Sequence, residues 1–338
     1  MSLSNLTGSL FVVAALVLGS PAWPEEINIY FKTSPPAEHV RPFADPATLS
    51  LLITGADGKP FAQGWVDMTL EAPKSGRFFS TDFPHVEGTQ LTEMRLPLRG
   101  GRTEWKYLFP IRGEYRLTVR VMTADGRQDH KTFPVRIREQ GYKWYLLGAF
   151  TLALFAFGVL AGRIFTRASP AVTHKATVSL LLLVLGLASK NTFAAEEPLQ
   201  EKYFAWLEVG PAGVGKPTQL SWRLQPDDTA SGKAALLTLT ISHLEKRKTV
   251  FSVERLPVAG EFSMRFQFTD GAEYRVAATA FVPGRGVVRT EQHVSVTAAE
   301  PPARAMLPAI GFFLAVIAVG LGVGRWSRWA TPSAADRV

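Results

Sequence analysis

The side chains best suited to chemistry in this 338-residue chain are its histidines, because the sequence contains no cysteine. The missing thiols exclude disulfides, Cys-ligated zinc, iron–sulfur clusters and thiol catalysis. Imidazole and methionine thioether are ligands that suit copper. The candidate metal ligands are four histidines: His85, His130, His243 and His293. The methionines that could join them are Met68, Met94, Met122 and Met264.

The spacing of these histidines matches no familiar metal motif, since no H-x-H, H-x-x-x-H or methionine-rich run occurs. Solvated or core histidines at ordinary frequency are the alternative for each position. His85 lies near Asp82 and Glu87, and His130 follows Asp129, so these two are the stronger candidates. The sequence leaves both readings open: no cofactor, or copper held by His and Met ligands.

Nucleophilic catalysis lacks its usual sequence marks. The chain has no G-x-S-x-G motif and no convincing Ser–His–acid set. The stretch GPAGVGKP, from Gly210 to Pro217, is similar to a phosphate-binding loop, but Pro217 stands where that motif needs Ser or Thr. We interpret the stretch as a loop between two strands and expect no enzyme activity.

Two long apolar runs, from Trp144 to Gly162 and from Ala305 to Gly324, contain no charged residue. Each is long enough, at about 1.5 Å per residue, to cross a hydrocarbon layer of about 30 Å. Arginines follow both runs, as they do at the cytoplasmic ends of membrane helices. We predict transmembrane helices over residues 143–165 and 304–325.

Two further segments resemble secretory leaders. Residues 1–23 have an apolar centre and small residues before a possible cut after Ala22, which predicts a signal peptide or an N-terminal anchor. Residues 176–195 follow Lys175 and contain a run of fourteen uncharged residues, ATVSLLLLVLGLAS, which is short for a span. That second segment is either a transmembrane helix or an internal signal-like segment.

An internal duplication explains why a leader-like segment lies in the middle of the chain. Three short matches occur in the same order in both halves: Gly162-Arg163 with Gly324-Arg325, Glu114-Tyr115-Arg116 with Glu273-Tyr274-Arg275, and Arg95-Leu96-Pro97 with Arg255-Leu256-Pro257. Their offsets are 162, 159 and 160 residues. We expect Tyr115 and Tyr274 each to bond back to the backbone as a tyrosine corner.

Residues 24–140 and 196–300 alternate polar and apolar side chains, and turn residues separate the runs. The first region has predicted strands at 49–53, 65–70, 104–109, 115–121 and 132–137. The second has predicted strands at 204–209, 218–224, 235–241, 262–268, 274–281 and 287–296. The predicted fold class is mainly β, with two immunoglobulin-like β-sandwich domains, each followed by a transmembrane α-helix.

Two phrases in the first domain, LLITGADGKPFAQGWVDMTLEAP (Leu51 to Pro73) and FFSTDFPHVEGTQL (Phe78 to Leu91), resemble the YtkA-like and FixH-like exported bacterial proteins. The resemblance covers about half of this domain, and the second domain lacks the Thr-Asp-Phe-Pro stretch. It implies exported β-sandwiches. It also implies an association with copper or with the assembly of respiratory complexes, as in some members of that group.

The net charge of +8 suggests a nucleic-acid partner, but the excess lies at the membrane edges. The proposed outer side has Lys143, Lys190 and Arg304, and the inner side has Arg163, Arg167, Lys175, Arg325, Arg328 and Arg337. By the positive-inside rule, 166–175 is a cytoplasmic loop, 326–338 is a cytoplasmic tail, and both β domains are periplasmic at a bacterial inner membrane.

We therefore expect no nucleic-acid partner and a protein embedded in the lipid bilayer. The predicted function is that of a non-enzymatic, membrane-anchored periplasmic accessory or assembly subunit of a larger integral membrane complex, respiratory or copper-dependent. The alternative is a periplasmic copper-binding protein that uses His and Met ligands on its β-sandwiches.

Overall fold

The computed structural model describes residues 27–76, 80–165, 205–224, 234–283, 286–300 and 302–329. The first half contains β1 (Asn28–Ser34), β2 (Ala47–Thr54), β3 (Gly64–Glu71), β4 (Gln90–Pro97), β5 (Arg102–Tyr107), β6 (Gly113–Thr123), β7 (Gln128–Ile137) and α1 (Gly141–Phe165). The second half contains β8 (Ala205–Val209), β9 (Pro217–Leu224), β10 (Ala235–His243), β11 (Lys248–Val258), β12 (Glu261–Gln267), β13 (Glu273–Val282), β14 (Gly286–Ser295) and α4 (Ala303–Trp329). The segments 1–23 and 166–195, with their predicted leaders and loop, lie outside the described residues.

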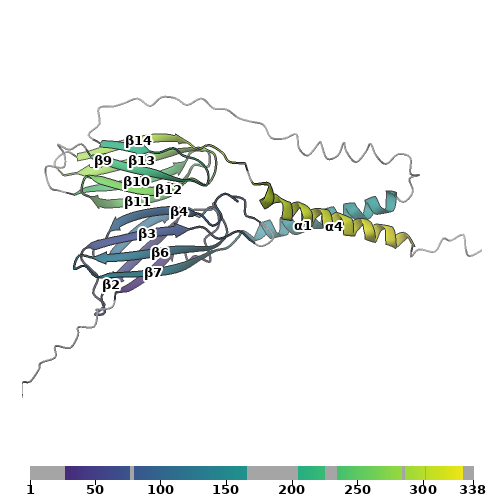
Figure 1. The fold of residues 1–338 in the computed structure, drawn as a ribbon, viewed down its shortest axis with the longest axis horizontal. Coiled ribbons are helices and arrows are strands. Elements are labelled where there is room, and N and C mark those ends of the chain that lie inside the picture. The colour runs from purple at the N-terminus through teal and green to yellow at the C-terminus, as the bar shows by residue number, and fades with distance from the viewer. Residues whose placement is uncertain are drawn as a thin grey trace, which may run out of the picture.

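The fold is mainly β, as predicted, but each of its two antiparallel sheets takes strands from both halves of the chain (Figure 1). One seven-stranded sheet has the order β1-β2-β5-β11-β10-β13-β14, and the other has the order β7-β6-β3-β4-β12-β9-β8. Buried side chains from both sheets form one apolar cluster. The sequence predicted two separate sandwiches, whereas the structure joins the halves edge to edge.

Two junctions join the halves, β5 against β11 and β4 against β12. The first pairs Trp105 with Val253, Lys106 with Ser252 and Tyr107 with Phe251. The second pairs Met264 with Met94, Arg265 with Glu93 and Phe266 with Thr92. Adding 159 to each β5 and β4 residue number gives its counterpart in β12 and β11. The junctions are therefore two copies of one contact, the arrangement that a two-fold axis produces.

The strands that form these junctions include two that the sequence did not predict, β4 and β11. Both contain the Arg-Leu-Pro marker of the duplication, and a proline argues against a strand because it has no N–H to donate. Pro97 is the last residue of β4 and Pro257 is the second-last of β11, so both lie beyond the paired junction residues. Strand β1 was the third one missed.

The tyrosine corner predicted at Tyr115 is confirmed. Its fully buried hydroxyl donates to the carbonyl oxygen of Ile111 at 2.6 Å and accepts from the N–H of Ile111 at 2.9 Å. The Tyr274 hydroxyl also contacts the backbone of Asp270, but it donates its proton to the carboxylate of that residue. The position of Asp270 corresponds to that of Ile111, so in the second half a carboxylate replaces the backbone carbonyl as the acceptor of the tyrosine proton.

We predict that Tyr115→Phe lowers the free energy of unfolding by about 1–3 kcal/mol, since it leaves two buried backbone groups of Ile111 without a partner. Tyr107→Phe is the matched control, because Tyr107 is equally buried and its hydroxyl has no hydrogen bond within the described residues. Thermal unfolding of the two variants measures the difference. Equal melting temperatures would contradict the prediction.

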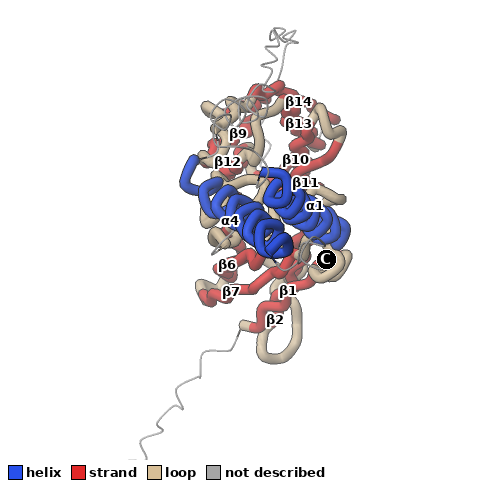
Figure 2. The backbone as a smooth tube through the Cα atoms, turned by 90° about the vertical axis from the view of Figure 1, so that its right-hand side faces the viewer, coloured by secondary structure: helices blue, strands red, loops and turns tan. Residues whose placement is uncertain are grey.

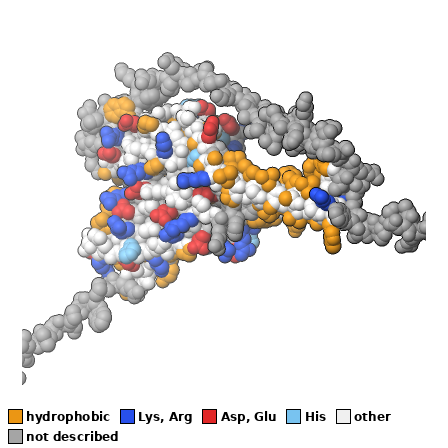
Figure 3. Space-filling model, turned by 45° about the vertical axis from the view of Figure 1, so that its right-hand side comes forward, with side chains coloured by type: hydrophobic (Ala, Val, Ile, Leu, Met, Phe, Trp, Pro, Cys, Tyr) orange, Lys and Arg blue, Asp and Glu red, His pale blue; other side chains and the backbone are white. Residues whose placement is uncertain are grey.

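The helices α1 and α4 lie side by side and run in the same direction, away from both sheets (Figure 1, Figure 2). The Phe150 and Phe313 rings meet at 5.3 Å near the start, and Arg163 donates to Ser327 at 3.2 Å near the far end. Both helices are long and apolar enough to cross a membrane. Their surface forms a continuous apolar band (Figure 3).

Four glycines bring the two helix backbones into contact. A Cβ added to Gly158 would lie 2.6 Å from the Ile317 carbonyl oxygen, and one added to Gly320 would lie 2.5 Å from the Phe155 carbonyl oxygen. Gly162 and Gly324 make the same contact one turn further on, against the backbones of Leu321 and Val159. The Gly-xxx-Gly pattern of each helix, offset by 162 residues, thus forms a symmetric packing surface.

Candidate functional site

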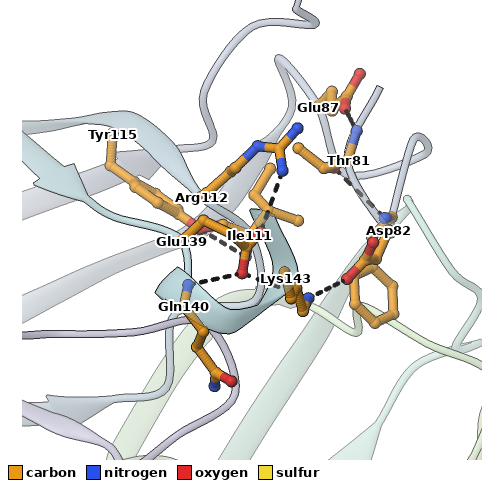
Figure 4. Close-up of polar contacts among 10 residues, drawn as sticks. Thr81, Asp82, Glu87, Ile111, Arg112, Tyr115, Glu139, Gln140 and Lys143 are labelled. Carbon is orange, nitrogen blue, oxygen red and sulfur yellow. Dashed lines mark hydrogen bonds and ion pairs between the residues drawn. The ribbon is translucent and has the colours of Figure 1, made fainter. Parts of the chain in front are cut away.

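Charged side chains fix the start of α1 to the end of the first half that faces the helices (Figure 4). The nearly buried Glu139 carboxylate accepts from Arg112 at 3.3 Å and lies 3.4 Å from the Lys143 amine. Lys143 also donates to Asp82 at 2.7 Å. Because Glu139 belongs to the link after β7 and Asp82 to the β3–β4 loop, these ion pairs tie the helix to two parts of the fold.

The β3–β4 loop is itself held in shape by Glu87 (Figure 4). The carboxylate of Glu87 accepts from the Ser80 hydroxyl at 2.9 Å and from the Thr81 N–H at 2.5 Å. This contact fixes the two residues that precede Asp82. The first half and α1 are therefore joined at this end by several polar contacts.

A hollow of about 780 Å³ lies beside the ion pairs at the start of α1. Five basic side chains line it, together with two acidic ones, Glu114 and Glu139. The basic residues are Lys74, Arg112, Arg116, Arg136 and Arg138. Trp144 of α1 also lines the hollow, and the Arg112 guanidinium lies over its ring at 5.3 Å. In Figure 3, Lys and Arg side chains are spread over the visible face of the β part and are mixed with Asp and Glu.

Most of this positive charge has no partner. Arg112 pairs with Glu139, and Arg116 lies 3.5 Å from Glu71. No ion pair is found for the other three basic side chains, Lys74, Arg136 and Arg138, within the described part of the chain. Glu114 faces Arg136 across the β6–β7 ladder without forming an ion pair. The hollow is therefore suited to an anion.

A second polar cluster surrounds the buried imidazole of His243. Its Nδ1 accepts from the Lys246 N–H at 3.3 Å, so Nε2 carries the proton and donates to Asp270 at 3.1 Å. Asp270 also accepts from the Lys246 amine and the Tyr274 hydroxyl. Each group has a partner, and the cluster lies at the tyrosine corner of the second half.

This cluster also contacts the first half. The Lys246 amine lies 4.0 Å from the centre of the Phe43 ring, and that ring packs on Phe83 at 5.0 Å. Lys248 donates to the carbonyl oxygen of Phe43 at 2.8 Å. The His243–Asp270 pair thus supports a contact between the halves, which is a structural role.

We predict that acid weakens this contact through Asp270. Burial alone would raise the pKa of its carboxyl, but hydrogen bonds from Lys246 and Tyr274, the Lys246 charge and His243 lower that pKa below its ordinary 3.8. A carboxyl whose pKa is lower in the folded than in the unfolded protein stabilises the fold at pH values above its unfolded-state pKa. That stabilisation is lost as the pH falls through its folded-state pKa. The melting temperature of wild type should therefore drop below pH 4, and that of Asp270→Asn should drop less. Parallel curves for the two proteins would contradict this.

The structure does not bring the four predicted metal ligands together. His243 is buried with Asp270, His130 is exposed on β7, and His293 is exposed on β14 beside Glu291 at 3.5 Å. His85 lies against Gly215, with its Nε2 buried and unpaired among the described residues. No group of three or more His, Asp or Glu side chains within the described ranges is placed to hold a metal ion. Copper binding stays a prediction.

Three of the four methionines do lie in one row. Met68 pairs with Met94 on the neighbouring strand, and Met94 pairs with Met264 across the junction. All three are almost fully buried in the apolar cluster. A metal ion there would need its charge buried without a counter-charge, which is costly. The row is best explained as flexible packing of the junction core.

Comparisons with known proteins identify no family for this fold, since no family model and no curated protein sequence matches the chain. Solved structures that align with it include a red sea bream transglutaminase, at 8% identity and a TM-score of 0.20 over 82% of this chain and 32% of that one. A bacterial ice-binding adhesin aligns at 10% identity and a TM-score of 0.23, over 82% of this chain and 66% of the other.

Dimeric latent PorU from Porphyromonas gingivalis aligns at 10% identity and a TM-score of 0.23, over 85% of this chain and 21% of that one. The chain thus spans less than two thirds of the length of each of these proteins. None of these likenesses carries a functional argument.

The basic hollow was not predicted from the sequence. Its one visible signal is the alternation of Arg136 and Arg138, which a strand places on the same face, immediately before the apolar run of α1. The remaining basic residues come from the β3–β4 loop, from the link before β6 and from β6 itself, so only the folded sheet brings them beside the end of β7. The net charge of the first half did not indicate the site, because acidic side chains elsewhere in that half balance the positive charge of the hollow.

Proposed function

We propose that this protein is a non-enzymatic, membrane-anchored accessory or assembly subunit of a larger complex in a bacterial inner membrane. Its two immunoglobulin-like halves would stand in the periplasm, and residues 326–338 would lie in the cytoplasm. The observation that carries the proposal is the parallel pair α1 and α4, which starts from both halves at one end of the joined sheets.

The extensive pairing between the two halves supports a scaffold role. Ladder pairing across both junctions is reinforced by the ion pairs Lys106–Glu254 at 2.7 Å and Arg265–Glu93 at 3.0 Å. The glycine faces of the two helices pack against each other. Their outer faces remain apolar and exposed, as at Leu152 and Leu160, and are available to lipid or to the helices of a partner.

The test is co-purification from native membranes under gentle detergent. We expect a tagged full-length chain to recover a fixed set of integral membrane proteins in stoichiometric amounts. Deletion of the gene should lower the amount of that assembled complex, and the intact chain should restore it. Recovery of the protein as a lone species, with no complex affected by the deletion, would overturn the proposal.

The connection between the halves makes a separate prediction. Phe165 lies at the far end of α1, whereas Ala205 starts a strand in the sheets. We expect the uncut form, in which residues 176–195 recross the membrane and one full-length product carries tags at both termini. Two membrane products of about half size would show instead that the segment is cut.

A further inference from the structure

The basic hollow lies beside the first turn of α1. Trp144, the fourth residue of α1, lines it, and the neighbouring Tyr142 and Tyr145 are exposed. Trp and Tyr side chains at the ends of membrane helices sit at the headgroup level. A helix that crosses the bilayer from this point therefore places the unpaired cations of the hollow beside the lipid phosphates.

The second half shows that the fold does not require these cations. The β6–β7 and β13–β14 hairpins have the same register at an offset of 159, since Glu114 faces Arg136 and Glu273 faces Ser295. At that offset Arg136 corresponds to Ser295 and Arg138 to Thr297. The hairpin is built equally well without arginine there, so the arginines of the first half need another explanation.

The chemistry of the lining favours a phosphodiester. Arginine presents a planar fork of donors that matches phosphate oxygens, and such charge-assisted bonds are among the stronger ones in proteins. Arg136 and Arg138 lie two residues apart on one face of the same strand end, and Lys74 and Arg116 face them within the same hollow. Glu114 is the one lining carboxylate that is not paired with a cation in the described residues, so the lining keeps a positive excess.

We propose that this hollow binds the phosphate of an anionic phospholipid from the leaflet in which α1 begins. The bound lipid would hold the first half against the membrane surface, with the Arg136 and Arg138 guanidinium groups on its phosphate oxygens. The proposal depends on α1 crossing the membrane and not on the accessory role, so the two can fail independently.

The test uses the full-length chain in detergent, with native mass spectrometry after addition of phosphatidylglycerol or phosphatidylcholine. We expect phosphatidylglycerol to bind about tenfold more tightly, and binding to weaken as salt is raised. The variant R136S/R138T, which carries the residues of the second half, should lose that preference. The control R120T/K131T removes two exposed charges from the same strands outside the hollow and also takes second-half residues, so it should bind as wild type.

Equal binding of the two lipids, or unchanged binding by R136S/R138T, would overturn the proposal. Displacement of phosphatidylglycerol by millimolar glycerol 3-phosphate or inorganic phosphate would also overturn it, since it would assign the hollow to a soluble phosphate. Circular dichroism checks that the variants fold. Should the double variant fail that check, the single variant R138Q gives the same readout and is expected to lose several-fold affinity.

Discussion

Gly162→Leu is expected to separate α1 from α4. A Cβ at this position would collide with the backbone of Leu321, which cannot move aside as a side chain can. Overpacking of a tight contact usually costs about 1–3 kcal/mol, and a whole leucine against backbone should reach the upper end. Because the chain has no cysteine, Phe150→Cys and Phe313→Cys report on the contact through their disulfide. We expect its yield to fall about tenfold when Gly162→Leu is added.

The matched control is Gly148→Leu in the same helix, since a Cβ at Gly148 has no neighbour within 4 Å. It adds the same apolar volume and the same helix propensity at a position where the added Cβ has no neighbour in α4. We expect it to leave the disulfide yield unchanged. Should both leucine variants cross-link equally well, the glycine contact would not be what holds the helices together.

The second large effect is expected from Phe266→Ala at the junction of β12 with β4. The Phe266 ring is fully buried and packs on Phe251 at 6.0 Å and Phe268 at 5.2 Å. Truncation of a buried phenylalanine costs about 3–5 kcal/mol. Because the sheets run through both halves, we expect one cooperative transition, with amide exchange accelerating in β3 of the first half as well as in β10 of the second.

The control for this experiment is Val287→Ala on β14, a second-half residue that is 68% exposed. It should change neither the melting temperature nor the exchange of either half. Accelerated exchange confined to the second half in Phe266→Ala would show that the halves unfold independently, and that the junctions add little to stability.

The individual strands could be predicted from the sequence far better than their assembly. Period-two alternation predicted most of them, because alternation reports directly on which side chains face a core. Which edge meets which edge depends on contacts between residues about 150 positions apart, as in Lys106–Glu254. The repeated Arg-Leu-Pro sequence indicated that the chain is duplicated. It did not predict that β4 and β11 form the junctions between the halves.

The candidate site was harder still to predict, for a physical reason. A histidine or methionine is visible as a ligand type, so the sequence drew attention to His85 and His130, neither of which belongs to a group of three or more possible metal ligands among the described residues. The hollow depends instead on the summed charge of arginines and a lysine from three separate segments. Only the pairing of Glu139 with Arg112 and Lys143 shows which charges remain free.

The offset of 159 residues between the two junctions has a consequence for stoichiometry. If the halves were separate identical chains forming a homodimer, every amino-acid substitution would appear in both subunits. Encoding both in a single chain supplies them in a one-to-one ratio and keeps each near its partner at high effective concentration. The halves can then diverge, as they have where Tyr115 bonds to backbone and Tyr274 bonds to Asp270. One half can face the lipid surface with arginine while the other presents serine and threonine.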